Sequence, residues 1–164
     1  MDTNADNNKD FFDPKKYKTL IVGQKNESKG TTDIISLLIN SENAEEREDA
    51  LRLIKKEPTA LELLMNAIDD KNLSDHKTQL IAACWESGID CRTQLNYFVN
   101  LAINEDYLGC IEASSVIDGM DPPLNQDELS RSVKQLHEAI KKASAEKKEL
   151  LKQLAEILSS YLQK

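Results

Sequence analysis

The residues of this chain that could perform acid–base or nucleophilic chemistry are few and far apart. Two histidines, His76 and His137, stand in polar stretches, and neither has a nucleophile or an acid at a spacing that catalytic sites use. The sequence has no glycine-rich phosphate loop, no G-x-S-x-G elbow and no H-E-x-x-H motif. We therefore expect both histidines at the surface, and we predict neither a catalytic residue nor a cofactor-binding site.

Three cysteines, Cys84, Cys91 and Cys110, are the only candidate thiol ligands. Six residues separate Cys84 from Cys91, whereas structural zinc sites favour cysteines separated by about two to four. Cys84 and Cys110 fall in apolar helical segments, where a cysteine packs as a small hydrophobe. An odd number of cysteines without a secretory signal indicates a reducing compartment, so we expect a cytoplasmic protein.

Carboxylates also gather near the expected helix ends, at Asp69-Asp70, Asp75 and Glu105-Asp106. Stacked helix pairs would bring these linkers to one edge, where a weak cation site is conceivable. No calcium-binding loop with its glycine is present. Solvated turns are the simpler interpretation, and we predict no metal site.

The charge distribution indicates the kind of partner. The formal net charge is −8, and residues 58–124 hold 11 acidic and 3 basic residues, while residues 1–57 carry −2 and residues 125–164 carry +2. Such a surface repels phosphate backbones and attracts basic proteins. No apolar run approaches the roughly 20 residues of a membrane span. We expect no nucleic acid and no membrane as partner.

The sequence predicts that helices position the residues named above. Apolar residues recur at helical spacing, and the chain has only five glycines and four prolines. We predict a flexible polar tail over residues 1–17, in which Phe11 and Phe12 could dock on the body or on a partner, and a single helical domain over residues 18–164. The eight expected helices cover about residues 32–40, 44–56, 58–70, 75–87, 92–104, 106–119, 126–143 and 145–162.

An internal repeat organises these helices. The pairs Ala67-Ile68, Ala102-Ile103 and Ala139-Ile140 each close an apolar stripe, and a polar linker and a second apolar helix follow each of them. A single pair cannot bury its apolar face alone, so neighbouring pairs must stack. The predicted fold class is all-α, an α-α superhelix of about four helix pairs.

One segment carries a family resemblance. Residues 46–54, with the sequence EREDALRLI, resemble the V-R-x-x-A-x-x-L/I second-helix pattern of the HEAT/armadillo superfamily, with Glu46 where valine is usual. The helix-pair rhythm extends over residues 32–162, whereas the motif covers only residues 46–54. The resemblance implies a stack of helix pairs that binds other proteins.

The C-terminal region allows two interpretations. Apolar positions alternate at spacings of four and three from Leu129 to Tyr161, with Lys147 as the exception. One continuous helix with a coiled-coil seam would explain that phase. A helical hairpin would explain why Leu151 and Leu158 widen the apolar stripe, and we favour the hairpin.

Two features suggest where a partner would bind. Trp85, the only tryptophan, stands at the margin of an apolar helix face, where half-burial is expected, although packing into the core is the commoner role. In the sixth expected helix one side carries an apolar stripe, and Leu108 and Ile111 point to other sides. We expect this helix to lie buried at the centre of the stack. If the second helices of the pairs line one face, that face presents the acidic and aromatic side chains Glu48, Trp85, Glu86 and Glu112.

We predict a non-enzymatic protein–protein interaction module, or scaffold, that uses this acidic face to bind a protein with a basic surface. The alternative is a structural helical bundle that forms a homodimer through residues 125–163. A metal-dependent or nucleic-acid-modifying enzyme is the third and least favoured interpretation, because it needs ligands or a basic groove that the sequence does not offer.

Overall fold

The computed structural model of this chain describes residues 29–162, with the side chains of residues 34–162. Contacts divide the chain into two units, Met1–Asp33 and Ile34–Lys164. The predicted tail with Phe11 and Phe12, and the expected boundary after residue 17, lie outside the described residues.

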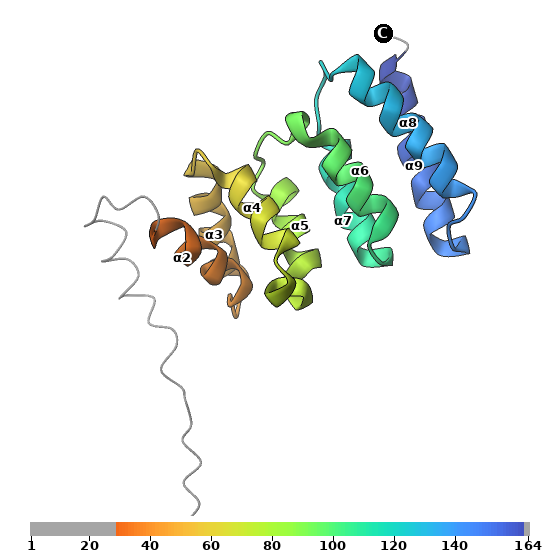
Figure 1. Cartoon of the computed structure of the whole chain (residues 1–164). Helices are drawn as coiled ribbons and strands as arrows, with labels where there is room; N and C mark the ends of the chain where they lie inside the picture. The colour runs from red at the N-terminus through yellow and green to blue at the C-terminus, as the bar shows by residue number, and fades with distance from the viewer. Residues whose placement is uncertain (1–28, 163–164) are drawn as a thin grey trace, which may run out of the picture. The chain divides into compact units, whose positions relative to one another are not determined.

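The described residues form α-helices and no strand, which confirms the predicted all-α class (Figure 1). Two short 3-10 helices, Lys71–His76 and Arg92–Gln94, precede α5 and α6. The eight predicted helices are all present in this part of the chain. Their bounds are α2 Lys29–Ile39, α3 Ala44–Lys56, α4 Ala60–Asp69, α5 Lys77–Glu86, α6 Leu95–Asn104, α7 Tyr107–Asp118, α8 Gln126–Ile140 and α9 Ala145–Leu162.

The start of α5 differs from the prediction. The sequence predicts a helix from about residue 75, but the 3-10 helix Lys71–His76 occupies that stretch. It forms because the Asp70 side chain accepts the backbone N–H of Asn72 at 2.9 Å, which begins the turn several residues earlier. The predicted stop at Gly88 is confirmed, since Gly88 has φ +67°, a left-handed conformation that suits glycine.

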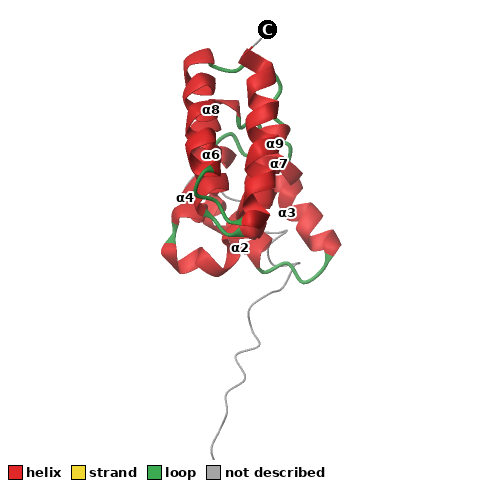
Figure 2. Ribbon diagram, turned by 90° about the vertical axis from the view of Figure 1, so that its right-hand side faces the viewer, coloured by secondary structure: helices red, strands yellow, loops and turns green. Residues whose placement is uncertain are grey.

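The helices of the second unit pack in two directions. Helices adjacent in sequence contact each other in the pairs α4–α5, α6–α7 and α8–α9. Successive pairs are joined by the contacts α5–α7, α6–α8 and α7–α9. Figure 2 shows α4, α6 and α8 in one layer and α7 and α9 in the other. A helix such as α7 therefore buries side chains against three neighbours.

The C-terminal region is a hairpin. The chain turns between Ile140 and Ala145, and α8 and α9 pack against each other. Of the apolar side chains that a coiled-coil seam would have used, Leu129, Leu136 and Leu154 are buried within the chain. Leu151 and Leu158, which widen the stripe, are buried as well. The prediction of a hairpin over one continuous helix is confirmed.

Lys147 interrupts the apolar spacing because its side chain forms hydrogen bonds with the end of another helix, α6. Its ammonium donates hydrogen bonds of 2.6 Å to the backbone carbonyls of Ile103 and Glu105. The last carbonyls of an α-helix have no partner within the helix, and α6 ends at Asn104 without a glycine after it. A cation from α9 thus satisfies the C-terminal end of α6.

We expect the substitution Lys147→Met to lower the free energy of unfolding by about 1.5–3 kcal/mol, because it keeps the aliphatic stem and removes a charged donor. Urea unfolding followed by circular dichroism measures this. Lys148→Met is the matched control: Lys148 is exposed and its replacement should change stability by less than about 0.5 kcal/mol. Equal effects of the two substitutions would contradict the capping role.

Tyr97 joins α6 to α4. Its hydroxyl donates to Oδ1 of Asp69 at 3.0 Å, with the carbonyl of Met65 at 3.4 Å. Burial raises the pKa of Tyr97 above its usual value, and the negative charge of Asp69 raises that pKa further. The neutral phenol is therefore the form that the folded chain favours.

Replacing Tyr97 by phenylalanine tests this link. At pH 7, Tyr97→Phe should cost about 0.5–1.5 kcal/mol, the net value of one hydrogen bond. Above the ordinary tyrosine pKa of 10.0 the unfolded wild type ionises while the folded form keeps its proton, so wild-type stability falls with rising pH. The advantage of the wild type over the variant should shrink between pH 9 and 11 in urea titrations; a constant difference would contradict the assignment.

Candidate interaction surface

Helices α5 and α7 position the predicted site. In α5 the side chains of Leu80, Ile81 and Cys84 are fully buried. The first turn of α7 is fixed by Asp106, whose carboxylate accepts the backbone N–H of Gly109 at 2.8 Å. A Cβ at Gly109 would lie 2.6 Å from the Cβ of Glu105, so this tight turn requires glycine.

Trp85 lies at the surface between these helices. Its side chain is 45% exposed, so the half-burial expected at the margin of the apolar face is confirmed, and the commoner role of tryptophan, packing into the core, is wrong for Trp85. The core-facing positions of α5 are already filled by the three buried residues before it. The indole Nε1–H donates a hydrogen bond of 2.8 Å to Oε2 of Glu112 in α7.

The predicted central burial of α7 is correct for one stripe and wrong for its first turn. Leu108 is 59% exposed and Tyr107 is 42% exposed. Packing against α5, α6 and α9 leaves that turn facing outward. The stripe that the sequence predicted is buried, and it comprises Cys110, Ala113, Ile117 and Met120.

We define the Trp85 surface as the side chains of Trp85, Leu108 and Glu112. Leu108 stands one helical turn before Glu112, so both side chains emerge on the same side of α7. The hydrogen bond places the Trp85 indole beside Glu112. An exposed aromatic ring and an exposed leucine therefore flank a carboxylate.

The other two predicted site residues lie apart from this contact. Glu86 points to α3, where its carboxylate pairs with Arg47 at 2.5 Å, and its side chain is 26% exposed. Glu48 is 71% exposed and lies 3.8 Å from Arg52 on its own helix. The structure joins Trp85 to Glu112 and pairs the charges of Glu86 and Glu48 with arginines.

Sequence reasoning missed two members of this region. Leu108 was assigned to a buried helix, although its spacing of four residues before Glu112 already placed both on one side. Arg47 gave no signal, because its partner Glu86 stands 39 positions away and only the fold brings them together.

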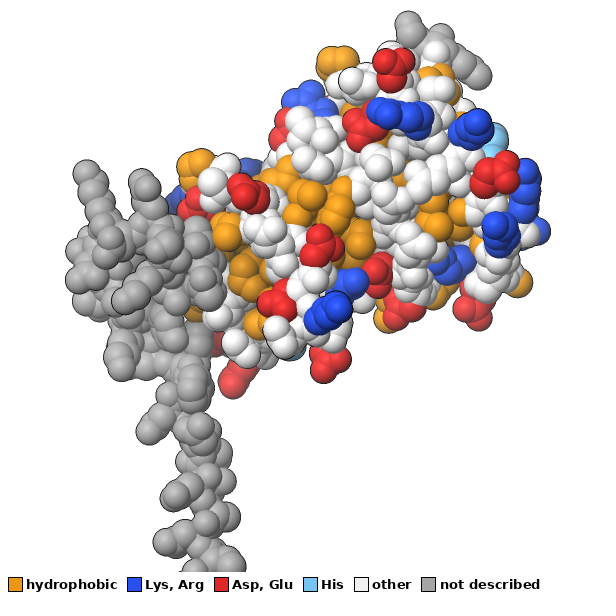
Figure 3. Space-filling model, viewed as in Figure 1, with side chains coloured by type: hydrophobic (Ala, Val, Ile, Leu, Met, Phe, Trp, Pro, Cys, Tyr) orange, Lys and Arg blue, Asp and Glu red, His pale blue; other side chains and the backbone are white. Residues whose placement is uncertain are grey.

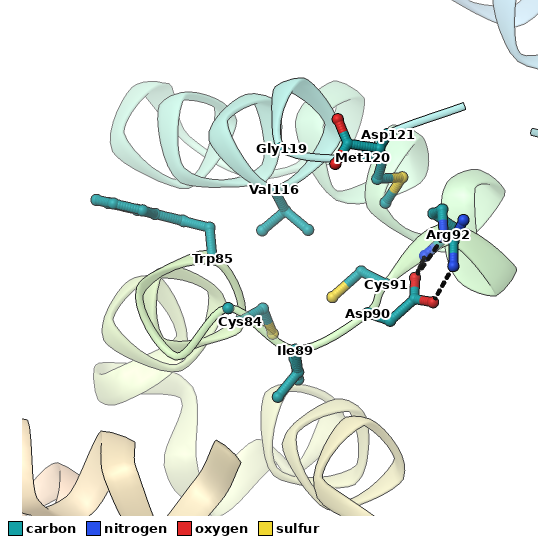
Figure 4. A pocket seen from close by; sticks show the side chains of 11 residues that line it. Cys84, Trp85, Ile89, Asp90, Cys91, Arg92, Val116, Gly119, Met120 and Asp121 are labelled. Carbon is teal, nitrogen blue, oxygen red and sulfur yellow. Dashed lines mark hydrogen bonds and ion pairs between the residues drawn. The ribbon is translucent and has the colours of Figure 1, made fainter. Parts of the chain in front are cut away.

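A pocket of about 350 Å³ opens beside Trp85. Figure 4 shows it between the end of α5, the loop after Gly88 and the end of α7. The loop contributes Cys91, Asp90 and Arg92, and α5 contributes Cys84 and Trp85. Its lining combines sulfur, apolar and charged side chains.

The charges at this pocket are partly paired. Arg92 donates to both carboxylate oxygens of Asp90, at 2.9 and 2.6 Å. These hydrogen bonds lower the pKa of Asp90 to about 2, so the carboxylate is ionised at neutral pH. Asp121 also lines the pocket, which leaves two acids for one arginine.

One histidine lies near serine hydroxyl groups that are distant from it in the sequence. His137 is exposed, as expected, and shares a shallow pocket between α8 and α9 with Ser159 and Ser160. Both serine hydroxyls donate to backbone carbonyls of their own helix, at 2.6 and 2.7 Å. Both hydroxyls are thus directed to the backbone and not to the imidazole, and catalysis of the serine–histidine type needs a hydroxyl that faces the imidazole.

Within residues 34–162, no group of three or more His, Cys, Asp or Glu side chains converges as a metal site would require. The carboxylates of the helix linkers, among them Asp70 and Asp106, instead accept backbone N–H groups at helix starts. In the same described part of the chain, every helix is too short or too polar to cross a bilayer.

Comparison of the chain with known protein families, with curated proteins and with solved structures finds no match. The HEAT/armadillo resemblance therefore stays a prediction.

The bond between Trp85 and Glu112 makes a spectroscopic prediction. Removing the acceptor with Glu112→Ala should free the indole, so that tryptophan emission shifts to the red and fluorescence anisotropy falls. Trp85 is the only tryptophan, so the signal has one source. Asp118→Ala removes an exposed acid elsewhere on α7 and should leave the spectrum unchanged; identical spectra for all three proteins would refute the bond.

Proposed function

We propose that this chain is a non-enzymatic interaction module whose Trp85 surface binds a protein segment that carries both basic and apolar side chains. We further propose that its helix pairs form a stack of the HEAT/armadillo kind. The contacts α5–α7 and α7–α9 in one layer, and α6–α8 in the other, support that arrangement, because the same element meets its equivalent in the next pair.

The observation that carries the proposal is an exposed indole held in place by a carboxylate. Tryptophan is enriched among the residues that dominate binding energy at interfaces. The hydrogen bond to Glu112 restricts the ring before any partner arrives, so less side-chain entropy is lost on binding. Leu108, at 59% exposure, adds apolar area on the same side.

Charge defines the chemistry of the partner. Residues 58–124 carry eight more acids than bases, and two of the three cations in that segment, Lys77 and Arg92, already pair with Glu105 and Asp90. On the face shown in Figure 3, basic side chains gather over α8. The negative field over α5 and α7 favours a cationic partner, and salt should screen it.

The three cysteines are free and buried, which suits a reducing compartment. The cytoplasm is therefore the proposed location of this interaction.

The experiment is affinity capture with the tagged full-length protein at about 0.05 M and about 0.5 M salt, followed by mass spectrometry. The same protein should be captured by wild type and by Leu162→Ser, which removes an exposed leucine far along the chain. Trp85→Ala and Leu108→Ser should each cost about 2 kcal/mol or more, which weakens binding roughly thirtyfold. A partner that is indifferent to both substitutions and to salt would contradict the proposal.

The alternative function, a homodimer through residues 125–163, has weaker support. The leucines of α8 and α9 are buried against each other and against α6 and α7, so few remain for a second copy. Sedimentation equilibrium of the full-length chain distinguishes the two, because a concentration-dependent dimer would favour the alternative.

A further inference from the structure

The pocket beside Trp85 contains a second feature that the interaction function does not use. Cys84 ends the buried face of α5, and Cys91 lies in the loop that follows Gly88. Both side chains line the same pocket, and Figure 4 shows both sulfur atoms in the space between α5 and that loop. Cys110, although fully buried, is not part of this lining.

From this arrangement we propose that Cys84 and Cys91 are a redox modification site, at which a peroxide converts the two thiols into a reversible intramolecular disulfide. The site would act on hydrogen peroxide or a small organic hydroperoxide that enters the pocket beside Trp85. The proposal does not depend on the identity of any protein partner.

The backbone explains why the two thiols meet. Gly88 adopts φ +67° after the last turn of α5, which reverses the chain and returns Cys91 to the helix end. Disulfides need α-carbon atoms within about 7 Å, and a reversal of this kind is one way to supply that spacing between residues seven positions apart. The neighbouring Cys91 thiol and burial both raise the pKa of the Cys84 thiol.

The reaction balances with peroxide as the only oxidant. The Cys91 sulfur attacks one peroxide oxygen and the O–O bond breaks. A sulfenic acid forms, and the departing oxygen takes the Cys91 proton and leaves as water, or as an alcohol when the oxidant is an organic hydroperoxide. The Cys84 sulfur then attacks the Cys91 sulfur, the S–O bond breaks, and the hydroxyl leaves as a second water with the Cys84 proton. Two S–H bonds are lost, one S–S bond forms, and the two electrons end on the peroxide oxygens.

Burial assigns the order of these steps. Cys84 is 0% exposed and Cys91 is 3% exposed, so the loop cysteine is the one that the peroxide reaches first. The pKa of Cys84 is raised by the neighbouring Cys91 and by burial, which makes Cys84 the less reactive thiol of the two. Since both sulfurs are nearly enclosed, oxidation should be slower than at an exposed thiol.

The chain offers a direct test. Trypsin cleaves after Lys77 and Arg92, so residues 78–92 form one peptide that holds Cys84, Trp85 and Cys91. The full-length folded protein is treated with hydrogen peroxide, alkylated with iodoacetamide, digested and analysed by mass spectrometry. We expect this peptide to lose two hydrogen atoms and to take no alkyl group, while Cys110 is alkylated once the chain unfolds.

Two variants make the result specific. Cys110→Ser leaves only Cys84 and Cys91, and it should form the disulfide as the wild type does. Cys91→Ser should form none, and dithiothreitol should restore alkylation of the wild type. A sulfinic or sulfonic acid in this peptide, a link to Cys110, a disulfide between chains, or full alkylation after peroxide would each overturn the proposal. Because the wild type itself is read out, a variant that fails to fold leaves the test intact.

Discussion

The structure depends on helices that must bury apolar side chains on more than one face. A helix such as α7 presents apolar residues to α5, α6 and α9, and Cys110, Ala113 and Ile117 are fully buried as a result. No pair could hold these side chains away from water alone, and the hydrophobic free energy lost would be about 25 cal/mol for each Å² left exposed. Each pair is therefore stable only as part of the set.

That constraint explains why so much of the fold was predictable and why the site was less so. Helical spacing of apolar residues fixes which face is buried, so the helices and the buried stripe of α7 were found. The spacing does not show where a packed helix lacks a neighbour, which is why Leu108 was assigned to a buried helix although it is 59% exposed. Contacts between distant residues, such as Arg47 with Glu86, have no local signal at all.

The four residues of the predicted acidic face do not form one site. Trp85 and Glu112 form a single contact across two helices, whereas the charges of Glu86 and Glu48 are shared with arginines. A list of acids in the sequence overstates the negative surface, because folding neutralises some of them. In the proposed function, the acidic side chains that remain over α5 and α7 would attract a cationic partner, and the exposed apolar area would hold it.

Lys147 also has a consequence for how the chain is made. Only Glu105 and Asp106 separate α6 from α7, and the carbonyl groups of Ile103 and Glu105 receive their hydrogen bonds from a lysine more than forty positions later. During synthesis this turn leaves the ribosome before its partner has been translated. Until α9 has been synthesised, water must solvate those carbonyls, so the pair α6–α7 reaches its final state only after α9 has left the ribosome.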